Sequence, residues 1–524
     1  MPDNVVDYVV VGGGTAGCIV AARLAVDPHV RVTLVETGGM DSNPAIYAQD
    51  LGSMFSLWNP QGAEDWGYAT TPQPGLADRA INIARGRVLG GCSAVNAMIY
   101  IRGHRRDFDA WAALGNRGWS YDDVLPYFKK SETYHGPASP YHGDNGPLSV
   151  INMQSPSAAS HAFVEAAAAL GATQTYNDFN GAVQEAGAGF YQSTRSMGAV
   201  RVTAASAFVR PVMGYPNFRL ILQARVTRVL VEGDRAVGVE VAGPDGVQTL
   251  RAEREVILSG GAFETPKLMM LSGFGPADDL GRLGLPVVAD LPGVGRNLQD
   301  HMLLGVGYEC PEPLDPAELL AEAGLFTWTD GADKDASPDL QYFFGPIQFV
   351  PDEYQTDAPA FTFAPILAQP ASRGTVTLQS SDPTSNARVD PAYLSRDADV
   401  AVLEYGMRYA RELVHTPAFD GLRGRELAPG DGVTSSADLS DYIRRVASTV
   451  WHPCGTCRMG ADGEAVVDDE LRVHGVSGLR IVDASVMPLI VNGNPNAAIM
   501  MIAERAADLI RGAAAPVALA TPKP

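Results

Sequence analysis

The sequence predicts a mixed α/β fold that is divided into two domains. A strand, a helix and a second strand follow one another within residues 6–36, which is the pattern of a parallel sheet covered by helices. The chain has 524 residues, more than the roughly 100–200 residues of a typical domain, so more than one folding unit is expected. Hydrophobic residues make up 46% of the chain and charged residues 19%, a balance that excludes disordered, coiled-coil and collagen-like proteins.

The first unit of the chain is the most clearly patterned. Residues 6–11 (VDYVVV) are a β-branched run that ends in glycines, which predicts a buried parallel strand. Residues 15–26 have helical periodicity, and residues 31–36 (RVTLVE) predict the second strand. Together they form a βαβ unit.

Later elements follow from periodicity and from glycine and proline punctuation. Helices are expected over residues 160–171, 398–416, 437–447 and 496–511. Strands are expected over three runs within residues 218–241, with a hairpin turn at Glu232–Arg235, and over residues 254–259 and 479–482. Residues 310–372 are rich in Pro, Asp and aromatic residues and show no clear period.

Charge and cysteine usage restrict the partners and the compartment. Lys and Arg total 39 against 60 Asp and Glu, a net charge of −21, which disfavours binding to nucleic acid or to an anionic membrane. No apolar run reaches the roughly 18 residues of a membrane span, and no basic segment precedes the first apolar run, so no signal peptide is expected. Five cysteines make no disulfide framework, which favours the cytoplasm. Cys454 and Cys457 form a C-x-x-C with too few neighbouring ligands to predict a metal site.

A glycine motif follows the first strand. Gly12, Gly14 and Gly17 form G-x-G-x-x-G, which permits a tight turn, close approach of a pyrophosphate and close packing of the helix on the strand. Glu36 ends the second strand, where a carboxylate would bind the ribose hydroxyls of an adenosine. The acid disfavours NADP, but the motif itself does not distinguish NAD from FAD.

Five further segments carry a family resemblance. They are GRVLGGCSAVN (86–96), GAFETPKLMMLSGFG (261–275), PGVGRNLQDH (292–301), WHPCGTCRMG (451–460) and VDASVMPLIVNGNPNAAIMM (482–501). In this order they resemble the glucose–methanol–choline family of FAD-dependent alcohol oxidoreductases. Within that family the chain looks most like bacterial choline oxidases and dehydrogenases and like hydroxymethylfurfural or aryl-alcohol oxidases. The resemblance covers nearly the whole chain and is weakest over residues 310–445.

The resemblance implies a discontinuous two-domain architecture. A Rossmann-like FAD-binding domain would comprise residues 1–155, 200–310 and 446–515. A substrate-binding domain built on an antiparallel sheet would comprise residues 156–199 and 311–445, and residues 516–524 would form a tail.

The resemblance also assigns a cofactor site. The residues expected to bind FAD are Gly12, Gly14, Thr15, Ala16, Gly17, Glu36, Arg87, Gly90, Gly91, Ser93, Asn96, Ala97, Val226, Asp483, Ala484, Asn494 and Pro495. Some choline oxidases attach FAD covalently through a histidine in this part of the chain, and the matching residue here is Val95. Non-covalent FAD is therefore expected.

The same motifs place His452 and Asn494 as the catalytic pair. Alcohol oxidation removes a hydroxyl proton and a hydride from one carbon; flavin N5 accepts the hydride, and the protein supplies a base. A histidine with an ordinary pKa near 6.5 suits that base, and an amide can hold the oxygen. Asn496 is a rival for the amide role. His301 is expected to be structural, and His104, His135 and His142 are expected at the surface.

The substrate is predicted from aromatic residues. Trp451, with Phe344 and Phe349, would line a pocket that stacks on a primary aromatic or furanic alcohol, which is oxidised to the aldehyde. The same rings could hold a quaternary ammonium group such as that of choline. Electrons would pass to O2, giving H2O2; a choline-type or other dehydrogenase that uses a quinone or another acceptor is the alternative. A non-redox lyase, a light-driven decarboxylase and a non-catalytic flavin-binding protein also stay open, as does the oligomeric state.

Overall fold

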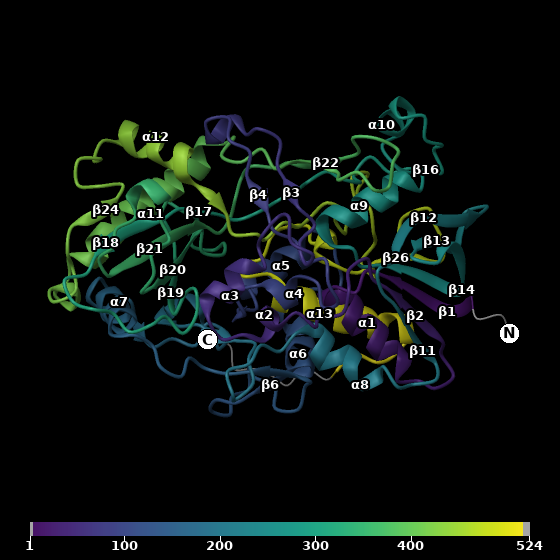
Figure 1. The fold of residues 1–524 in the computed structure, drawn as a ribbon, viewed down its shortest axis with the longest axis horizontal. Helices are drawn as coiled ribbons and strands as arrows, with labels where there is room; N and C mark the ends of the chain where they lie inside the picture. Colours follow the sequence, from purple (N-terminus) through teal and green to yellow (C-terminus); the bar gives the residue numbers. More distant parts are fainter. Residues whose placement is uncertain (1–3, 517–524) are drawn as a thin grey trace.

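The computed structural model describes residues 4–516 and shows two lobes side by side (Figure 1). The first lobe is built on a seven-stranded sheet and the second on a nine-stranded sheet. The predicted two-domain α/β fold is confirmed. Most of the expected tail, residues 517–524, lies outside the described residues.

The sheet of the first lobe combines a parallel and an antiparallel part. Its order is β11-β2-β1-β14-β13-β12, with β26 paired to β14. The parallel strands are β1 (Val5–Val11), β2 (Val32–Val35), β11 (Phe218–Ile221), β26 (Leu479–Ile481) and the end of β14 (Gly246–Leu258). The strands β12 (Arg225–Glu232) and β13 (Arg235–Gly243) form the expected hairpin beside β14.

Two helices pack together against the parallel part of this sheet. Helix α1 (Thr15–Ala25) follows β1, and α13 (Asn496–Arg511) comes from the other end of the chain. Arg23 joins them through a bidentate ion pair to the fully buried Glu504, with nitrogen–oxygen distances of 2.6 and 3.0 Å. The C-terminal helix therefore completes the domain that the N-terminal strand begins.

The sheet of the second lobe is almost entirely antiparallel. Its order is β24-β18-β21-β20-β19-β9-β8, and β17 pairs with β21 and β25. The strands of this sheet are β8 (Gln174–Thr175), β9 (Gly187–Phe190), β17 (Met302–Leu303), β18 (Val306–Glu309), β19 (Ala323–Thr327), β20 (Leu340–Gly345), β21 (Ala360–Leu367), β24 (Glu426–Ala428) and β25 (Ser448–Thr449). The short strands β17, β18 and β25 come from stretches that the sequence had assigned to the FAD-binding domain, and they join the second sheet instead.

Both faces of this second sheet are buried. Helices α7 (Ala158–Ala169), α11 (Asp397–Val414) and α12 (Ser436–Val446) pack on one side, where Tyr342 and Phe344 enter a core with Phe163. Phe343 points to the other side, toward residues of the first lobe. Every residue of β20 and β21 is buried, so these strands lack the apolar–polar alternation of a half-exposed strand. That burial explains why residues 310–372 show no period.

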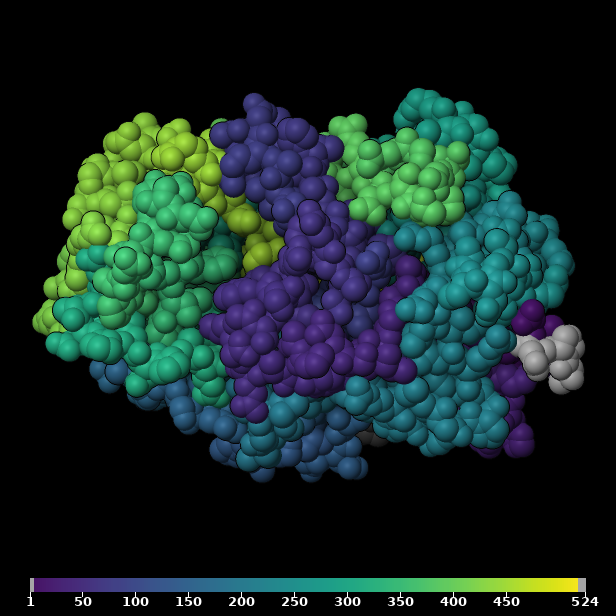
Figure 2. Space-filling view, viewed as in Figure 1, coloured from purple at the N-terminus to yellow at the C-terminus, as the bar shows by residue number. Residues whose placement is uncertain are grey.

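A segment of the first hundred residues lies across the junction of the lobes. It contains α2 (Pro44–Tyr47), α3 (Leu51–Ser56), α4 (Cys92–Val95) and the β3–β4 hairpin (Tyr68–Ala69 and Asn82–Ile83). In Figure 2 these purple to blue residues cover the front of the junction, and a hollow separates them from the green second lobe. Helix α5 (Arg105–Ala113) follows in the centre of the molecule (Figure 1).

Two expectations for single features were wrong. His104 and His142 are buried, with 3% and 7% of their surface exposed, rather than at the surface. Acidic partners explain the difference, because His104 lies 3.0 Å from Glu185 and His142 lies 2.9 Å from Asp178. Helix α7 is capped by Ser157, slightly earlier than the expected start. His135 is exposed as expected.

None of the helices within residues 4–516 has the length and apolar character needed to cross a bilayer.

Candidate active site

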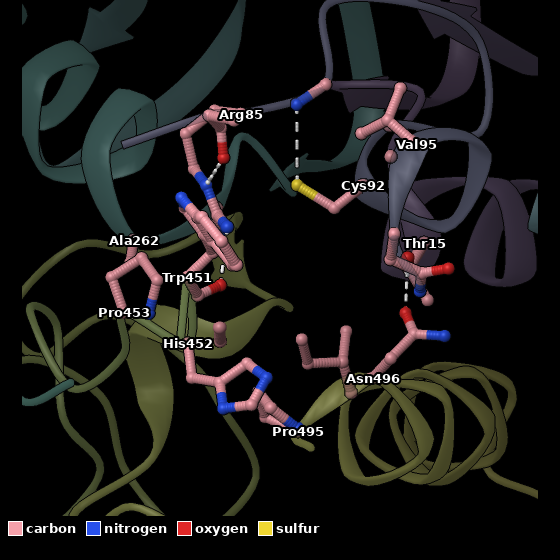
Figure 3. Close-up of a pocket in the computed structure, with 18 of the residues that line it drawn as sticks. Thr15, Arg85, Cys92, Val95, Ala262, Trp451, His452, Pro453, Pro495 and Asn496 are labelled. Atoms are coloured by element: carbon pink, nitrogen blue, oxygen red, sulfur yellow. Dashed lines mark hydrogen bonds between the residues drawn. The ribbon is translucent and has the colours of Figure 1, made fainter. Parts of the chain in front are cut away.

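A large cavity lies between the two lobes. Its empty volume is about 1440 Å³, which includes open solvent at its mouth. Figure 3 shows Thr15, Cys92, Trp451 and His452 around its open centre. The glycine turn after β1 lines one end, and aromatic side chains line the other.

The glycine turn has the geometry that a dinucleotide site requires. Gly12 has φ +99°, and a Cβ atom there would lie 2.5 Å from the carbonyl oxygen of Ser259. A Cβ at Gly17 would lie 1.9 Å from the carbonyl oxygen of Gly12, so this glycine permits α1 to pack on the strand. At Gly14 the nearest heavy atom would be 3.9 Å away, and this residue lines the cavity. The backbone of Gly14 is therefore open to a ligand.

The N-terminus of α1 and the end of β2 provide the polar contacts. Helix α1 has no acidic residue in its first turn and no capping side chain, so its first N–H groups can bind phosphate oxygens. Glu36 accepts hydrogen bonds from the N–H groups of Gly13 at 2.7 Å and Gly38 at 2.6 Å. Burial raises the pKa of Glu36 to about 7. These groups fit the pyrophosphate and the ribose of a dinucleotide.

The expected cofactor residues other than Gly17 divide into three groups. Those that line the cavity are Gly12, Gly14, Thr15, Ala16, Glu36, Gly91, Asn96, Ala97, Asp483, Ala484, Asn494 and Pro495. Val226 lines an adjoining cavity of about 370 Å³ that shares Gly12 and Glu264 with the large one. Arg87, Gly90 and Ser93 border neither cavity: Arg87 donates to the carbonyl of Ala63 at 3.2 Å, and Ser93 donates to that of Gly90 at 2.6 Å.

A strand pair brings two histidines together at the other end. Strand β25 pairs with β17, so the residues that flank these strands, His452 and His301, become neighbours. Asp300 accepts from the backbone N–H of His452 at 2.7 Å, and Arg85 donates to the carbonyl oxygen of Trp451 (Figure 3). These contacts hold the turn that carries Trp451, which has φ +61°.

Hydrogen bonding determines which nitrogen of His452 carries a proton. His301 Nε2 lies 3.0 Å from the carbonyl oxygen of Ala368, which can only accept, so Nε2 of His301 is the protonated nitrogen. In neutral His301 the Nδ1 atom then accepts from His452 Nδ1, at 3.0 Å. The proton of neutral His452 therefore lies on Nδ1, and its Nε2 atom presents a lone pair. His301, which is expected from the sequence to be structural, therefore sets the position of the proton on His452 through its hydrogen bonds.

Asn494 faces that lone pair. Its Nδ2 atom lies 3.2 Å from His452 Nε2, and its Oδ1 atom is buried without a hydrogen-bond partner. Asn496, the rival residue, accepts a hydrogen bond from Thr15 at 2.9 Å instead (Figure 3). The structure thus brings Asn494, and not Asn496, to the histidine. The unpaired oxygen is the kind of atom that a bound ligand satisfies.

Burial keeps this histidine pair neutral. Burial lowers the pKa of His452 well below 6.5, and the nearby charge of the Arg85 guanidinium lowers it further. Burial also lowers the pKa of His301 to about 4. A neutral His452 can accept a proton from a substrate hydroxyl at ordinary pH.

The side of the cavity beyond His452 is apolar and aromatic. Trp451 packs on Trp58 with ring centroids 4.6 Å apart. Phe343, an aromatic residue of the unmatched region 310–372, lines the large cavity and also a smaller one of about 350 Å³ next to it. Strand alternation could have identified it, because neighbouring residues of a strand face opposite sides.

The smaller cavity has no titratable side chain in its wall. Its lining consists of Leu303, Leu320, Phe343, Phe344, Gly345, Ile347, Phe349, Thr362, Ala364 and Trp451. Phe349 and Trp451 are thus placed as expected. Phe344 borders this cavity as well, but its ring stacks on Phe163 at 4.8 Å, on the helix-covered side of the sheet. The carboxylates of the large cavity, Glu36, Glu264 and Asp483, lie near the glycine turns of the first lobe.

The part of the chain that the structure describes contains no recognisable metal-binding cluster. Within residues 4–516, His, Cys, Asp and Glu side chains form no group of three that could hold a metal ion. Cys454 and Cys457 are buried free thiols, and burial raises the pKa of each. A neutral base, here His452, beside a cavity that fits a dinucleotide is typical of oxidoreductases that use a nucleotide cofactor.

Comparison with known proteins identifies the family. The chain belongs to the GMC oxidoreductase family, whose N-terminal model matches residues 6–303 and whose C-terminal model matches residues 370–503. It is therefore an FAD-dependent alcohol oxidoreductase, and the dinucleotide that the cavity fits is FAD.

Individual relatives are named for different substrates. The oxygen-dependent choline dehydrogenase of Brucella anthropi is 38% identical over 97% of this chain and 95% of its own length. The crystal structure of pyridoxine 4-oxidase from Mesorbium loti is similar with a TM-score of 0.89 at 36% identity, covering 96% of this chain and 98% of that one. A fungal aryl-alcohol oxidase is similar with a TM-score of 0.82 at 25% identity, covering 97% and 99%.

Proposed function

We propose that this protein oxidises a neutral primary alcohol, aromatic or furanic, to its aldehyde and passes the electrons to O2 to give H2O2. One observation carries the choice of substrate: the pocket beyond His452 is aromatic and aliphatic and contains no carboxylate. A flat aromatic alcohol can stack on Trp451 and Phe343 without burying a charge. Among proteins of similar structure, one is named an aryl-alcohol oxidase and another a pyridoxine 4-oxidase.

Choline is the competing substrate, because relatives at 38% identity are named choline dehydrogenases. A quaternary ammonium group could rest on Trp451 or Trp58 by cation–π contact, which contributes roughly 0.5–2 kcal/mol. Desolvating a cation in an apolar pocket without an anionic partner costs several kcal/mol. The balance favours a neutral substrate.

The proposed proton step uses the histidine pair. His452 Nε2 takes the proton of the substrate hydroxyl, because hydrogen bonding leaves that atom as the acceptor. The Asn494 amide, 3.2 Å from Nε2, donates to the developing alkoxide and holds the oxygen beside the base. After the transfer, the proton on His452 Nδ1 stays hydrogen-bonded to His301, which disperses the new positive charge.

FAD, when bound, supplies the acceptor for the hydride that leaves the alcohol carbon. Gly14, Thr15 and the first turn of α1 would hold its pyrophosphate, and Glu36 would hold a ribose. Val95, which lines the cavity, has no nucleophilic atom, so we expect FAD to be released intact when the protein is precipitated with acid. Protein-bound yellow colour after precipitation would contradict non-covalent binding.

The electron acceptor is tested by product stoichiometry. Purified holoenzyme is supplied with an aromatic alcohol in air, and aldehyde and H2O2 are both measured. One H2O2 per aldehyde is expected. Negligible H2O2 together with fast reduction of an added dye would make the protein a dehydrogenase. Binding of the alcohol without any reduction of the flavin would instead favour a lyase or a light-driven enzyme.

A further inference from the structure

A fourth cavity shares no lining residue with the three cavities described above. Its empty volume is about 510 Å³. Residues 102–106 line one wall, and residues 179–185 line the other. The first of these segments leads into α5, whose Asp107 accepts from the backbone N–H of Asn492 at 2.7 Å. The cavity is therefore separate from the large one but close to the chain that carries Asn494.

Positive groups converge on this cavity. Arg105 has a buried Nε atom without a partner, and its nearest carboxylate, that of the exposed Asp122, is 3.8 Å away. The Arg106 guanidinium donates to the carbonyl oxygens of Lys334 and Ala336 and has no carboxylate within ion-pair distance among residues 4–516. Such a concentration of arginine is unexpected in a chain with a net charge of −21.

The N-terminus of α5 opens on the same cavity. This end of the helix is capped by His104, whose carbonyl oxygen accepts from the N–H of Asp107 at 3.0 Å and whose own N–H donates to the Asp107 carboxylate at 2.8 Å. His104 Nδ1 accepts from the N–H of Arg106 at 3.2 Å, so its other nitrogen, Nε2, donates to Glu185 at 3.0 Å. His104 is thus neutral, and Glu185 is the one carboxylate in the cavity wall.

Gln184 provides the independent sign of a ligand. Only 5% of its surface is exposed, and it lines the cavity. Both its Nε2 and its Oε1 atoms are buried without a hydrogen-bond partner. A buried amide left unpaired at both atoms costs roughly 1–3 kcal/mol per group, so a bound molecule that pairs with both would be favoured.

We infer that this cavity binds a small oxyanion that carries a proton, with hydrogenphosphate as the matching species. Its unprotonated oxygens would accept from the Arg105 guanidinium and from Gln184 Nε2. Its hydroxyl group would donate to Gln184 Oε1. Sulfate has the same shape but no proton at neutral pH, so it would leave Oε1 unpaired.

The test measures phosphate binding to the FAD-loaded enzyme by calorimetry in a phosphate-free buffer. One inorganic phosphate per chain is expected to bind, and sulfate is expected to bind at least about tenfold more weakly. Arg105→Gln and Gln184→Met should each weaken phosphate binding about tenfold or more, since each removes a direct contact. Alcohol oxidation without phosphate should be unchanged in both variants, which also shows that they fold.

Arg388→Gln serves as the matched control. Arg388 lines a different cavity, between α10 (Ala277–Arg282) and β22 (Thr375–Thr377), which also contains Arg282 and Arg296. Its substitution should leave phosphate binding unchanged. The inference is overturned if phosphate fails to bind the wild-type enzyme below about 10 mM, if sulfate binds as well as phosphate, or if Arg105→Gln and Gln184→Met bind phosphate as the wild type does.

Discussion

Substitution of His301 tests whether hydrogen bonding sets the reactive form of His452. In His301→Phe, both the Nδ1–H of His452 and the carbonyl of Ala368 lose partners that now lie 3.0 Å away. His452 would then shift its proton to Nε2, where the Asn494 oxygen can accept it after the amide rotates. The Nε2 atom of His452 would then have no lone pair to accept the substrate proton, although the ring would keep its position in the cavity.

The expected magnitude follows from the unmade hydrogen bond. Leaving a buried donor unpaired costs about 1–3 kcal/mol, which corresponds to roughly a 5- to 150-fold decrease in the reactive form. We therefore expect the rate of anaerobic flavin reduction by alcohol, measured by rapid mixing, to fall about 10- to 100-fold. FAD content should stay the same, because His301 lines neither the large cavity nor its neighbour.

Two further variants make the experiment specific. His301→Gln can accept from His452 and donate to Ala368, so it should recover much of the lost rate. His474→Phe is the control, since the side chain of this half-buried histidine lies 3.0 Å from the Gly460 carbonyl oxygen, in neither cavity. An unchanged rate of flavin reduction in His301→Phe would refute the reasoning, as would equal losses in the phenylalanine and glutamine variants.

Three other predictions concern pH, the amide and the glycine turn. Because burial lowers the pKa of His452 well below 6.5, the rate of flavin reduction should stay constant from pH 8 to pH 6 and decline only at lower pH; a decline centred at or above 6.5 would contradict the burial of a neutral base. Asn494→Ala should lower that rate roughly 10- to 1000-fold while FAD content changes little, and the opposite pattern would make Asn494 a cofactor ligand. Gly17→Ala should abolish FAD binding and lower the melting temperature, because the new Cβ atom would lie 1.9 Å from the Gly12 carbonyl oxygen; a variant that retains FAD would show that the turn can relax. Each variant is compared with the wild type by visible absorbance and thermal unfolding.

Local patterns predicted the first lobe well. Helix α13 occupies Asn496–Arg511, the range expected from its amphipathic period, and the β12–β13 hairpin turns at Glu232–Arg235 as predicted. These elements depend on interactions between residues that are close in sequence. Strands β19, β20 and β21 were not predicted, because α7 and α11 cover one face of the sheet and the first lobe covers the other. Burial on both faces removes the alternation on which a strand prediction depends.

Motifs identified the predicted catalytic pair, His452 and Asn494, but they did not identify His301 as the partner of His452. His301 and His452 are 151 positions apart, and only the pairing of β17 with β25 brings them together. His104 and His142 have polar sequence neighbours, so they resembled surface residues. Their acidic partners, Glu185 and Asp178, come from distant parts of the chain and make burial possible. Interactions of this kind are decided by the fold rather than by any local pattern.

The most direct test of the central claim follows the visible flavin spectrum of the purified protein without oxygen. An aromatic alcohol, a furan alcohol, choline and an aliphatic alcohol are added in turn, and air is then admitted. We expect the aromatic or furan alcohol to bleach the flavin fastest, choline to leave it oxidised, and air to restore the colour rapidly. Bleaching by choline but not by the aromatic or furan alcohols would contradict the proposal that the carboxylate-free pocket selects a neutral alcohol.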